Sequence, residues 1–323
     1  MIKKNFYNKF ICKIIDYLLL VLIIPAGYIM LIYKKIGSLK MSNSTKILKK
    51  IGIFPIREHY YEPQFIYDNK NLIFSKKRNL PGINLEVKKQ LNFLRKLNFS
   101  KELISLNMDN FSPNYKFNID NSFFSRGDAE IYYQIIRFLK PKNIIEIGSG
   151  YSTLIALEAV KKNKEINNVL TEITCIEPFE NFWLKKLNVN FLKKKVEDID
   201  YKKITNKLSK GDILFVDSSH IIKPAGDVLK IFLEILPKLK KGVVIHFHDI
   251  FTPRNYLEKW IVKDVLFWNE QYLLESLISN SKNYQILCSL NFLKHKFFKH
   301  LKKSCPYINF FSEPGSIYIR KIN

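Results

Sequence analysis

The chain has 323 residues, 47% of them apolar, and its 53 Lys and Arg against 29 Asp and Glu give a formal net charge of +24. This length predicts one catalytic domain with an accessory region. The four cysteines show no paired metal spacing and do not suggest a disulfide framework, so they favour a reducing cytosol. Because the lysines are spread along the whole chain without an arginine-rich tract or an RNA-binding module, the charge favours an anionic membrane surface as partner over nucleic acid.

The first predicted element is an uncharged apolar run at residues 17–33 with lysines on both sides. The run is at the short limit for a membrane span, which needs about 17 to 25 residues, and Pro25 with Gly27 would weaken a straight helix. We therefore expect residues 1–35 to associate with a membrane, as a single span or as a bent segment in one leaflet, with the catalytic domain in the cytosol. Lysines on both sides leave the orientation open. A buried core helix is the alternative.

Residues 36–125 form the expected accessory region, which would lie over the active site as a lid. Within it, His59, Tyr60 and Tyr61 form an aromatic cluster that suits a sugar-like acceptor, although such clusters more often pack in a core. A helix is predicted at residues 128–139, where apolar side chains recur at helical spacing and Pro141 follows as a stop.

The next segment is an apolar strand that ends on a carboxylate and runs into two glycines. Glu146, Gly148 and Gly150 follow one another at alternate positions, and a helix begins after them. In an open α/β sheet, ligands bind outside the carboxyl ends of the strands, where glycine lets the backbone come close. A dinucleotide site would need a third small residue, but Thr153 stands there. The pattern therefore favours a cofactor that carries an adenosine without a pyrophosphate.

Further apolar runs predict the rest of a sheet. Residues 170–176, 189–192, 212–216, 242–247, 285–289 and 316–322 have the length and the β-branched and aromatic content of buried strands. Helices are expected between them at residues 152–162, 227–236 and, as one or two helices, 257–279. The predicted fold is α/β: a Rossmann-like, seven-stranded and mostly parallel sheet with helices on both faces, the last strand antiparallel.

At this point the sequence resembles the class I S-adenosylmethionine-dependent methyltransferases, whose first motif reads acid-x-Gly-x-Gly. The order of strands and their polar endings are also similar, so the resemblance implies a methyltransferase domain at residues 126–323 that binds S-adenosylmethionine. Most of residues 50–295 resemble a bacterial methyltransferase family found beside surface-glycan genes. The resemblance implies that Glu177 accepts both ribose hydroxyls and that the segment around Glu197 contacts adenine. The implied cofactor residues are Glu146, Gly148, Gly150, Ser152, Glu177, Glu197, Asp198 and Asp217.

Two carboxylates are expected at the chemical centre, because Asp217 and Asp249 follow neighbouring strands. Such a pair suits Mg²⁺, which prefers oxygen ligands. In the catechol O-methyltransferase-like branch, acids at these positions bind a divalent metal and a base lies three residues after the first, which here is His220. Ile250 replaces that branch's amide residue, and His248 could supply a different ligand, so a metal requirement stays open. The alternatives are helix capping or loop solvation for the acids and a backbone hydrogen bond for His220.

The sequence thus predicts methyl transfer from S-adenosylmethionine to a hydroxyl of a sugar, glycolipid or other small molecule. Asp217, His220 and Asp249 are the predicted catalytic residues, with His220 as general base because imidazole titrates near neutral pH. Asp217, His248 and Asp249 are the predicted metal ligands. The alternatives are an RNA methyltransferase and a catalytically inactive, membrane-tethered binding protein. The acceptor, the choice between O- and N-methylation and the oligomeric state stay open.

Overall fold

The computed structural model describes residues 2–37, 40–51, 76–109, 116–179, 183–264 and 266–323. The chain divides into two compact units, Met1–Ile73 and Phe74–Asn323. The division falls inside the expected accessory region 36–125, and the three-part domain organisation stays a prediction. The aromatic cluster expected as a lid, His59 to Tyr61, lies outside the described residues.

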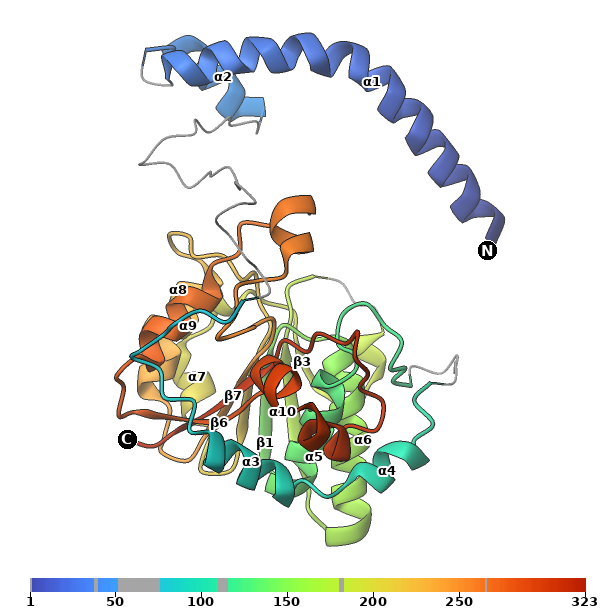
Figure 1. Cartoon of the computed structure of the whole chain (residues 1–323), viewed down its shortest axis with the longest axis vertical. Helices are drawn as coiled ribbons and strands as arrows, with labels where there is room; N and C mark the ends of the chain where they lie inside the picture. The colour runs from blue at the N-terminus through green and yellow to red at the C-terminus, as the bar shows by residue number, and fades with distance from the viewer. Residues whose placement is uncertain (1, 38–39, 52–75, 110–115, 180–182, 265) are drawn as a thin grey trace. The chain divides into compact units, whose positions relative to one another are not determined.

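The first unit contains two helices, α1 (Ile2–Ile36) and α2 (Ser42–Ile51) (Figure 1). Helix α1 continues through Pro25, so the expected weakening at Pro25 and Gly27 does not interrupt it. Its part Ile11–Ile36 has a mean hydropathy of 2.3 and is the one helix, among the described residues, that is long and apolar enough to cross a membrane. The side chains of residues 11–29 are all exposed and Tyr33 is buried near the end of the helix, so the apolar stretch as a whole is not the buried core helix of the alternative. The hydroxyls of Tyr33 and Thr45 form a 2.5 Å hydrogen bond between α1 and α2.

The second unit is built on one seven-stranded sheet with the strand order β3-β2-β1-β4-β5-β7-β6. The first five strands are parallel, and β7 is antiparallel to both of its neighbours. This confirms the predicted seven-stranded, mostly parallel sheet with an antiparallel last strand. The strands are β1 (Asn143–Ile147), β2 (Glu172–Ile176), β3 (Asn190–Leu192), β4 (Ile213–Val216), β5 (Val244–Phe247), β6 (Tyr284–Ser289) and β7 (Ile317–Lys321).

Helices cover both faces of the sheet, and alternate strand residues point into two separate cores (Figure 1). On one face, Ile144 and Phe215 belong to a core that also holds side chains of α3 (Val87–Lys96), α4 (Ser100–Ser105), α5 (Asp128–Leu139), α6 (Tyr151–Asn167) and α10 (Leu290–Ser304). On the other face, Ile145 and Val216 pack with α7 (Tyr201–Thr205), α8 (Asp227–Lys230) and α9 (Glu270–Ile278). Shorter helical turns are η1 (Leu184–Lys186), η2 (Val196–Asp198), η3 (Ile231–Ile235), η4 (Leu236–Lys238) and η5 (Lys259–Lys263).

Several predicted helices differ from the observed ones at their ends. Helix α5 has the predicted bounds, whereas α6 begins one residue earlier than expected and continues to Asn167. The helix expected to stop before Pro237 instead continues through η3 into η4. Proline has no backbone N–H to donate, but the first turn of a new 3₁₀ segment does not need that donor, so Pro237 is tolerated there. The stretch expected as one or two helices contains η5 and α9. Helices α2, α3, α4, α7 and α10 were not predicted.

Candidate active site

The loop between β1 and α6 brings backbone to the carboxyl end of the sheet without side chains in the way. Gly148 has a φ of +81°, a region that L side chains rarely adopt, and a Cβ there would lie 1.7 Å from the carbonyl oxygen of Asp217. Only glycine therefore lets the ends of β1 and β4 approach this closely. At Gly150, a Cβ would meet nothing within 4 Å, because this residue borders open space.

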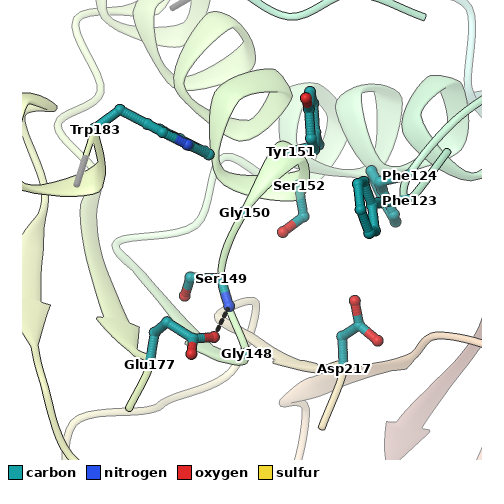
Figure 2. Close-up of a pocket in the computed structure, with 10 residues that line it drawn as sticks. All are labelled: Phe123, Phe124, Gly148, Ser149, Gly150, Tyr151, Ser152, Glu177, Trp183 and Asp217. Carbon is teal, nitrogen blue, oxygen red and sulfur yellow. Dashed lines mark hydrogen bonds between the residues drawn. The ribbon is translucent and has the colours of Figure 1, made fainter. Parts of the chain in front are cut away.

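That open space is a cavity of about 350 Å³ at the carboxyl ends of the parallel strands (Figure 2). A second cavity, of about 170 Å³, shares Gly148, Glu177 and Asp217 with the first, so the two are neighbouring parts of one groove. The remaining residues of the larger cavity are Phe123, Phe124, Ser149, Gly150, Tyr151, Ser152 and Trp183. Those of the smaller cavity include Ile176, Pro178, Phe179, Val196, Glu197, Ser218 and Ser219.

Glu177 stands at the border between the two cavities, and backbone groups fix its carboxylate. Oε2 accepts a hydrogen bond from the amide of Ser149 at 3.2 Å (Figure 2). Oε1 accepts one from the amide of Phe179 at 2.8 Å. Each carboxylate oxygen can accept more than one hydrogen bond. Glu177 is therefore held in one orientation while it keeps acceptor capacity for a ligand.

The predicted cofactor residues divide between the groove and the interior. Six of them line the cavities: Gly148, Gly150, Ser152, Glu177 and Asp217 in the larger and Glu197 in the smaller. Asp198 is exposed and lines neither cavity, and Glu146 is fully buried beneath the loop. The hydroxyls of Thr153 and Tyr132 donate to the Glu146 carboxylate, at 2.5 and 3.2 Å, and burial raises its pKa to about 7. Glu146 thus lies beneath the turn and lines neither cavity, and its role toward a cofactor stays a prediction.

Next to the groove, two histidines and two carboxylates come together from the ends of β4 and β5. Nε2 of His220 lies 3.3 Å from an oxygen of Asp217 and 3.5 Å from an oxygen of Asp249. His220 and Asp249 both have left-handed backbone, with φ of +59° and +57°. Non-glycine residues in this conformation are uncommon, and such strain gathers at functional sites. His248 lies beside these three residues. The four residues that the sequence predicted for the chemical centre are thus adjacent.

Three of these side chains could hold a cation. One ligand atom each of Asp217, His248 and Asp249 lie within 4.8 Å of one another. Nδ1 of His248 is buried, at 3.4 Å from Asp217 and 3.5 Å from Asp249, and it makes no hydrogen bond to the described residues. Buried polar atoms normally have a partner, so this arrangement fits a bound ion. Mg²⁺ prefers a set of ligands that are all oxygen atoms, so two carboxylates and one imidazole fit it less well than such a set does. The same three ligands also suit Mn²⁺.

A buried carboxylate that the sequence analysis did not assign holds His220 from the other side. Glu270, at the start of α9, is fully buried, and one of its oxygens lies 2.8 Å from Nδ1 of His220. The backbone amides of Asn269 and Glu270 also donate to the carbonyl oxygen of His220. Burial lowers the pKa of His220, but the hydrogen bonds with Asp217 and Glu270 outweigh burial and raise that pKa to about 10. His220 therefore bonds acids, and not only backbone.

Charges in the rest of the cluster follow from the same contacts. Burial raises the pKa of Asp249 to about 6 although the nearby histidines lower it, and burial also raises the pKa of Glu270. The two histidines outweigh the effect of burial on Asp217 and hold its pKa below the usual range, so Asp217 is ionised. His246 lies deeper in the sheet, where its Nε2 is 2.7 Å from the hydroxyl of Ser316.

Comparisons with known proteins agree with this arrangement. Residues 145–250, which begin within β1 and end just after β5, match a family described as a methyltransferase domain. An uncharacterised protein from Archaeoglobus fulgidus is 29% identical over 187 residues, which cover 52% of this chain and 80% of that protein.

The solved structures that match are distant in sequence, and their TM-scores are below 0.5. An O-methyltransferase from Bacillus cereus in complex with S-adenosylhomocysteine is 13% identical, with a TM-score of 0.37, and the match covers 71% of this chain and 90% of that chain. CalS11, a TDP-rhamnose 3'-O-methyltransferase, is 12% identical, with a TM-score of 0.36 and coverage of 79% and 99%. The MycE methyltransferase of mycinamycin biosynthesis, in complex with Mg and S-adenosylhomocysteine, is 14% identical, with a TM-score of 0.39 and coverage of 66% and 56%.

Proposed function

Because the chain carries a methyltransferase domain on a class I fold, we propose that it transfers the methyl group of S-adenosylmethionine to a hydroxyl of a sugar, glycolipid or other small molecule. The observation that carries this proposal is the position of the groove. Its glycine loop and Glu177 adjoin a cluster of two histidines and two acids at the same edge of the sheet. In this proposal, the cofactor site therefore lies next to His220, the candidate proton acceptor.

The groove fits the parts of S-adenosylmethionine in order. The smaller cavity, with Phe179 and Val196, offers apolar surface for the adenine, and Glu177 at the border has free acceptor capacity for the ribose hydroxyls. The larger cavity, with the backbone of Gly150 and the side chain of Ser152, offers space and a donor for the amino-acid end. When bound, the cofactor supplies an electrophilic methyl group on a positively charged sulfur.

The side chains next to the groove would orient the acceptor and take its proton. Nε2 of His220 faces Asp217 and Asp249, so it is the imidazole nitrogen available to an acceptor hydroxyl at this edge. With a pKa of about 10, His220 is protonated at neutral pH in the protein without ligands. A divalent cation, Mg²⁺ or Mn²⁺, held by Asp217, His248 and Asp249 would supply positive charge beside this imidazole and favour its neutral form.

We also propose that α1 anchors the enzyme at the cytoplasmic side of a membrane with anionic lipids. The exposed apolar side chains of Ile11–Ile36 and the lysines at both ends of this stretch support the anchor. A membrane-bound enzyme would meet glycolipid acceptors at the bilayer surface. The catalytic unit would then face the cytosol, where S-adenosylmethionine is made.

The cofactor part of the proposal is tested by calorimetric titration of the full-length protein, in detergent micelles, with S-adenosylmethionine. We expect saturable binding, and about 10- to 100-fold weaker binding by Glu177→Ala, because the variant loses a charged acceptor for hydroxyl donors. The exposed Glu165 provides a matched control, and Glu165→Ala should bind as the wild type does. Equal binding by wild type and Glu177→Ala would contradict the assignment of Glu177.

A further inference from the structure

The larger cavity carries an exposed aromatic side chain that the loop before α5 holds in place. Phe123 is 73% exposed, although its phenyl ring is apolar. Oδ1 of Asn121 accepts hydrogen bonds from the amides of Phe123 and Phe124, at 2.9 and 2.7 Å, and Nδ2 of Asn121 donates to the carbonyl oxygen of Asn118. The loop is thus braced by one side chain, and the exposed ring is presented at a fixed place.

This ring forms a wall of the cavity together with Tyr151, the first residue of α6. The two rings are stacked with an interplanar angle of 11° and centroids 5.7 Å apart. The indole of Trp183 meets Tyr151 edge-on, with centroids 6.3 Å apart. All three residues line the larger cavity, and Figure 2 shows Phe123 and Tyr151 above the carboxylate of Asp217.

The charges around the cavity are opposite to those of the whole molecule. Its described lining residues include the carboxylates of Glu177 and Asp217 and neither lysine nor arginine, although the chain has 53 of these and a net charge of +24. Aromatic faces carry negative partial charge and attract cations. A phosphate or another anion would need positive groups here. The described lining therefore favours a ligand that carries a positive charge.

We propose that the stacked pair Phe123 and Tyr151 recognises the sulfonium charge of the cofactor and so favours S-adenosylmethionine over its product, S-adenosylhomocysteine. This inference rests on the proposed function. When the acceptor oxygen bonds the methyl carbon, the carbon–sulfur bond breaks and its electron pair stays on sulfur, which becomes a neutral thioether, while the hydroxyl proton passes to the neutral imidazole of His220. The attraction between the aromatic faces and the charge then disappears. Transfer of the methyl group itself thereby weakens the hold on the product and favours its exchange for fresh cofactor.

The test compares binding of the charged and the neutral ligand by the full-length protein in detergent micelles. S-adenosylmethionine and S-adenosylhomocysteine are titrated calorimetrically into the wild type, Phe123→Leu and Phe123→Tyr. Leucine keeps the apolar surface and removes the aromatic face. We expect Phe123→Leu to bind S-adenosylmethionine about three- to tenfold more weakly and S-adenosylhomocysteine within about twofold of the wild type. Phe123→Tyr should restore the wild-type ratio, because it restores the aromatic face.

Phe311 provides the control, since it is 94% exposed and lies outside the cavity, and Phe311→Leu should leave both affinities unchanged. Equal weakening of both ligands in Phe123→Leu would mean that the ring is only an apolar cover, and no change in either would mean that it does not touch the ligand. Both results overturn the inference. A folded wild type that binds neither ligand would overturn the proposed function as well.

Discussion

Glu146 and Glu177 belong to the ends of neighbouring strands but have different surroundings. Glu177 follows β2 and lines the groove, whereas Glu146 lies inside β1 and is enclosed by hydroxyls of α5 and α6. The sequence predicted both as cofactor residues, because each ends an apolar run on a carboxylate. The direction of the Glu146 side chain depends on how α5 and α6 pack on the sheet, and a pattern of residue types does not contain that information.

The buried position of Glu146 predicts a pH dependence of stability. Its pKa is raised from 4.5 to about 7, so between these pH values the folded protein binds a proton that the unfolded chain has released. Stability from this group is therefore present below pH 4.5 and is lost as the pH rises to 7. Glu146→Gln removes the titration, and its neighbouring hydroxyls can reorient toward the amide. We expect the unfolding free energy of the variant relative to wild type to rise by up to about 3 kcal/mol from pH 4.5 to pH 7.

Urea titration of the full-length protein in detergent micelles at several pH values measures this difference. Glu165→Gln is the control, because Glu165 is exposed, on helix α6, and its ion pair with Lys162 lowers its pKa. The difference between that variant and wild type should stay flat in the same pH window. If the difference in unfolding free energy between Glu146→Gln and wild type is also independent of pH, the pKa of Glu146 is not raised. The hydrogen bonds to its carboxylate would then offset the effect of burial, which would contradict the prediction.

Glu270 illustrates a functional position that residue patterns did not identify. It is close to His220 only because α9 returns to the end of β4, and 50 residues separate the two in the sequence. Glu270 lies within residues 50–295, which resemble a methyltransferase family, but the residue pattern assigned no role to this acid. By contrast, the sequence could predict that four other residues lie close together, since residues that follow adjacent parallel strands meet at one edge of the sheet. These residues are Asp217, His220, His248 and Asp249.

At the scale of elements, the strands were easier to predict than the helices. Buried parallel strands are continuous apolar runs, which the sequence displays directly. Helix α10 was missed because its stretch is rich in lysine and histidine, and its apolar face is carried by a few residues such as Leu293 and Leu301. The helical turn η4 begins at Leu236, the last residue of the expected helix, and extends past Pro237, because a proline is compatible with the start of a new turn.

Helix α1 gives the prediction that belongs to this scale. In cell membranes, the full-length protein should stay in the pellet after an alkaline carbonate wash. The double substitution Leu22→Lys and Ile23→Lys should shift it to the supernatant, since each charge at the centre of a span costs about 3 kcal/mol. Leu170→Lys changes an exposed leucine of the second unit, which is 68% exposed, and should leave the protein in the pellet. Release of the wild type by carbonate would contradict a membrane anchor.

For the whole molecule, the net positive charge and the acidic side chains of the groove indicate two different binding partners. The charge is spread over the chain and fits a membrane surface, whereas the groove and the cluster beside it contain Glu177, Asp217 and Asp249. Composition could predict the first and not the second, because local charge depends on which side chains the fold turns inward. The same limit applies to Phe123 and Tyr151, whose stacking joins a loop to a helix that lies after the first strand.

The most direct test of the central claim is methyl transfer by the full-length protein. The purified protein in detergent micelles is supplied with methyl-labelled S-adenosylmethionine, Mg²⁺ or Mn²⁺, and separate pools of glycolipids, sugar nucleotides and ribosomal RNA. We expect label on a hydroxyl in one of the sugar-containing pools. His220→Gln should lower the rate by about 10²- to 10⁴-fold with cofactor binding unchanged, and the exposed control His300→Gln should not. Label on RNA, an equal rate in His220→Gln, or cofactor binding without transfer to any pool would contradict the account.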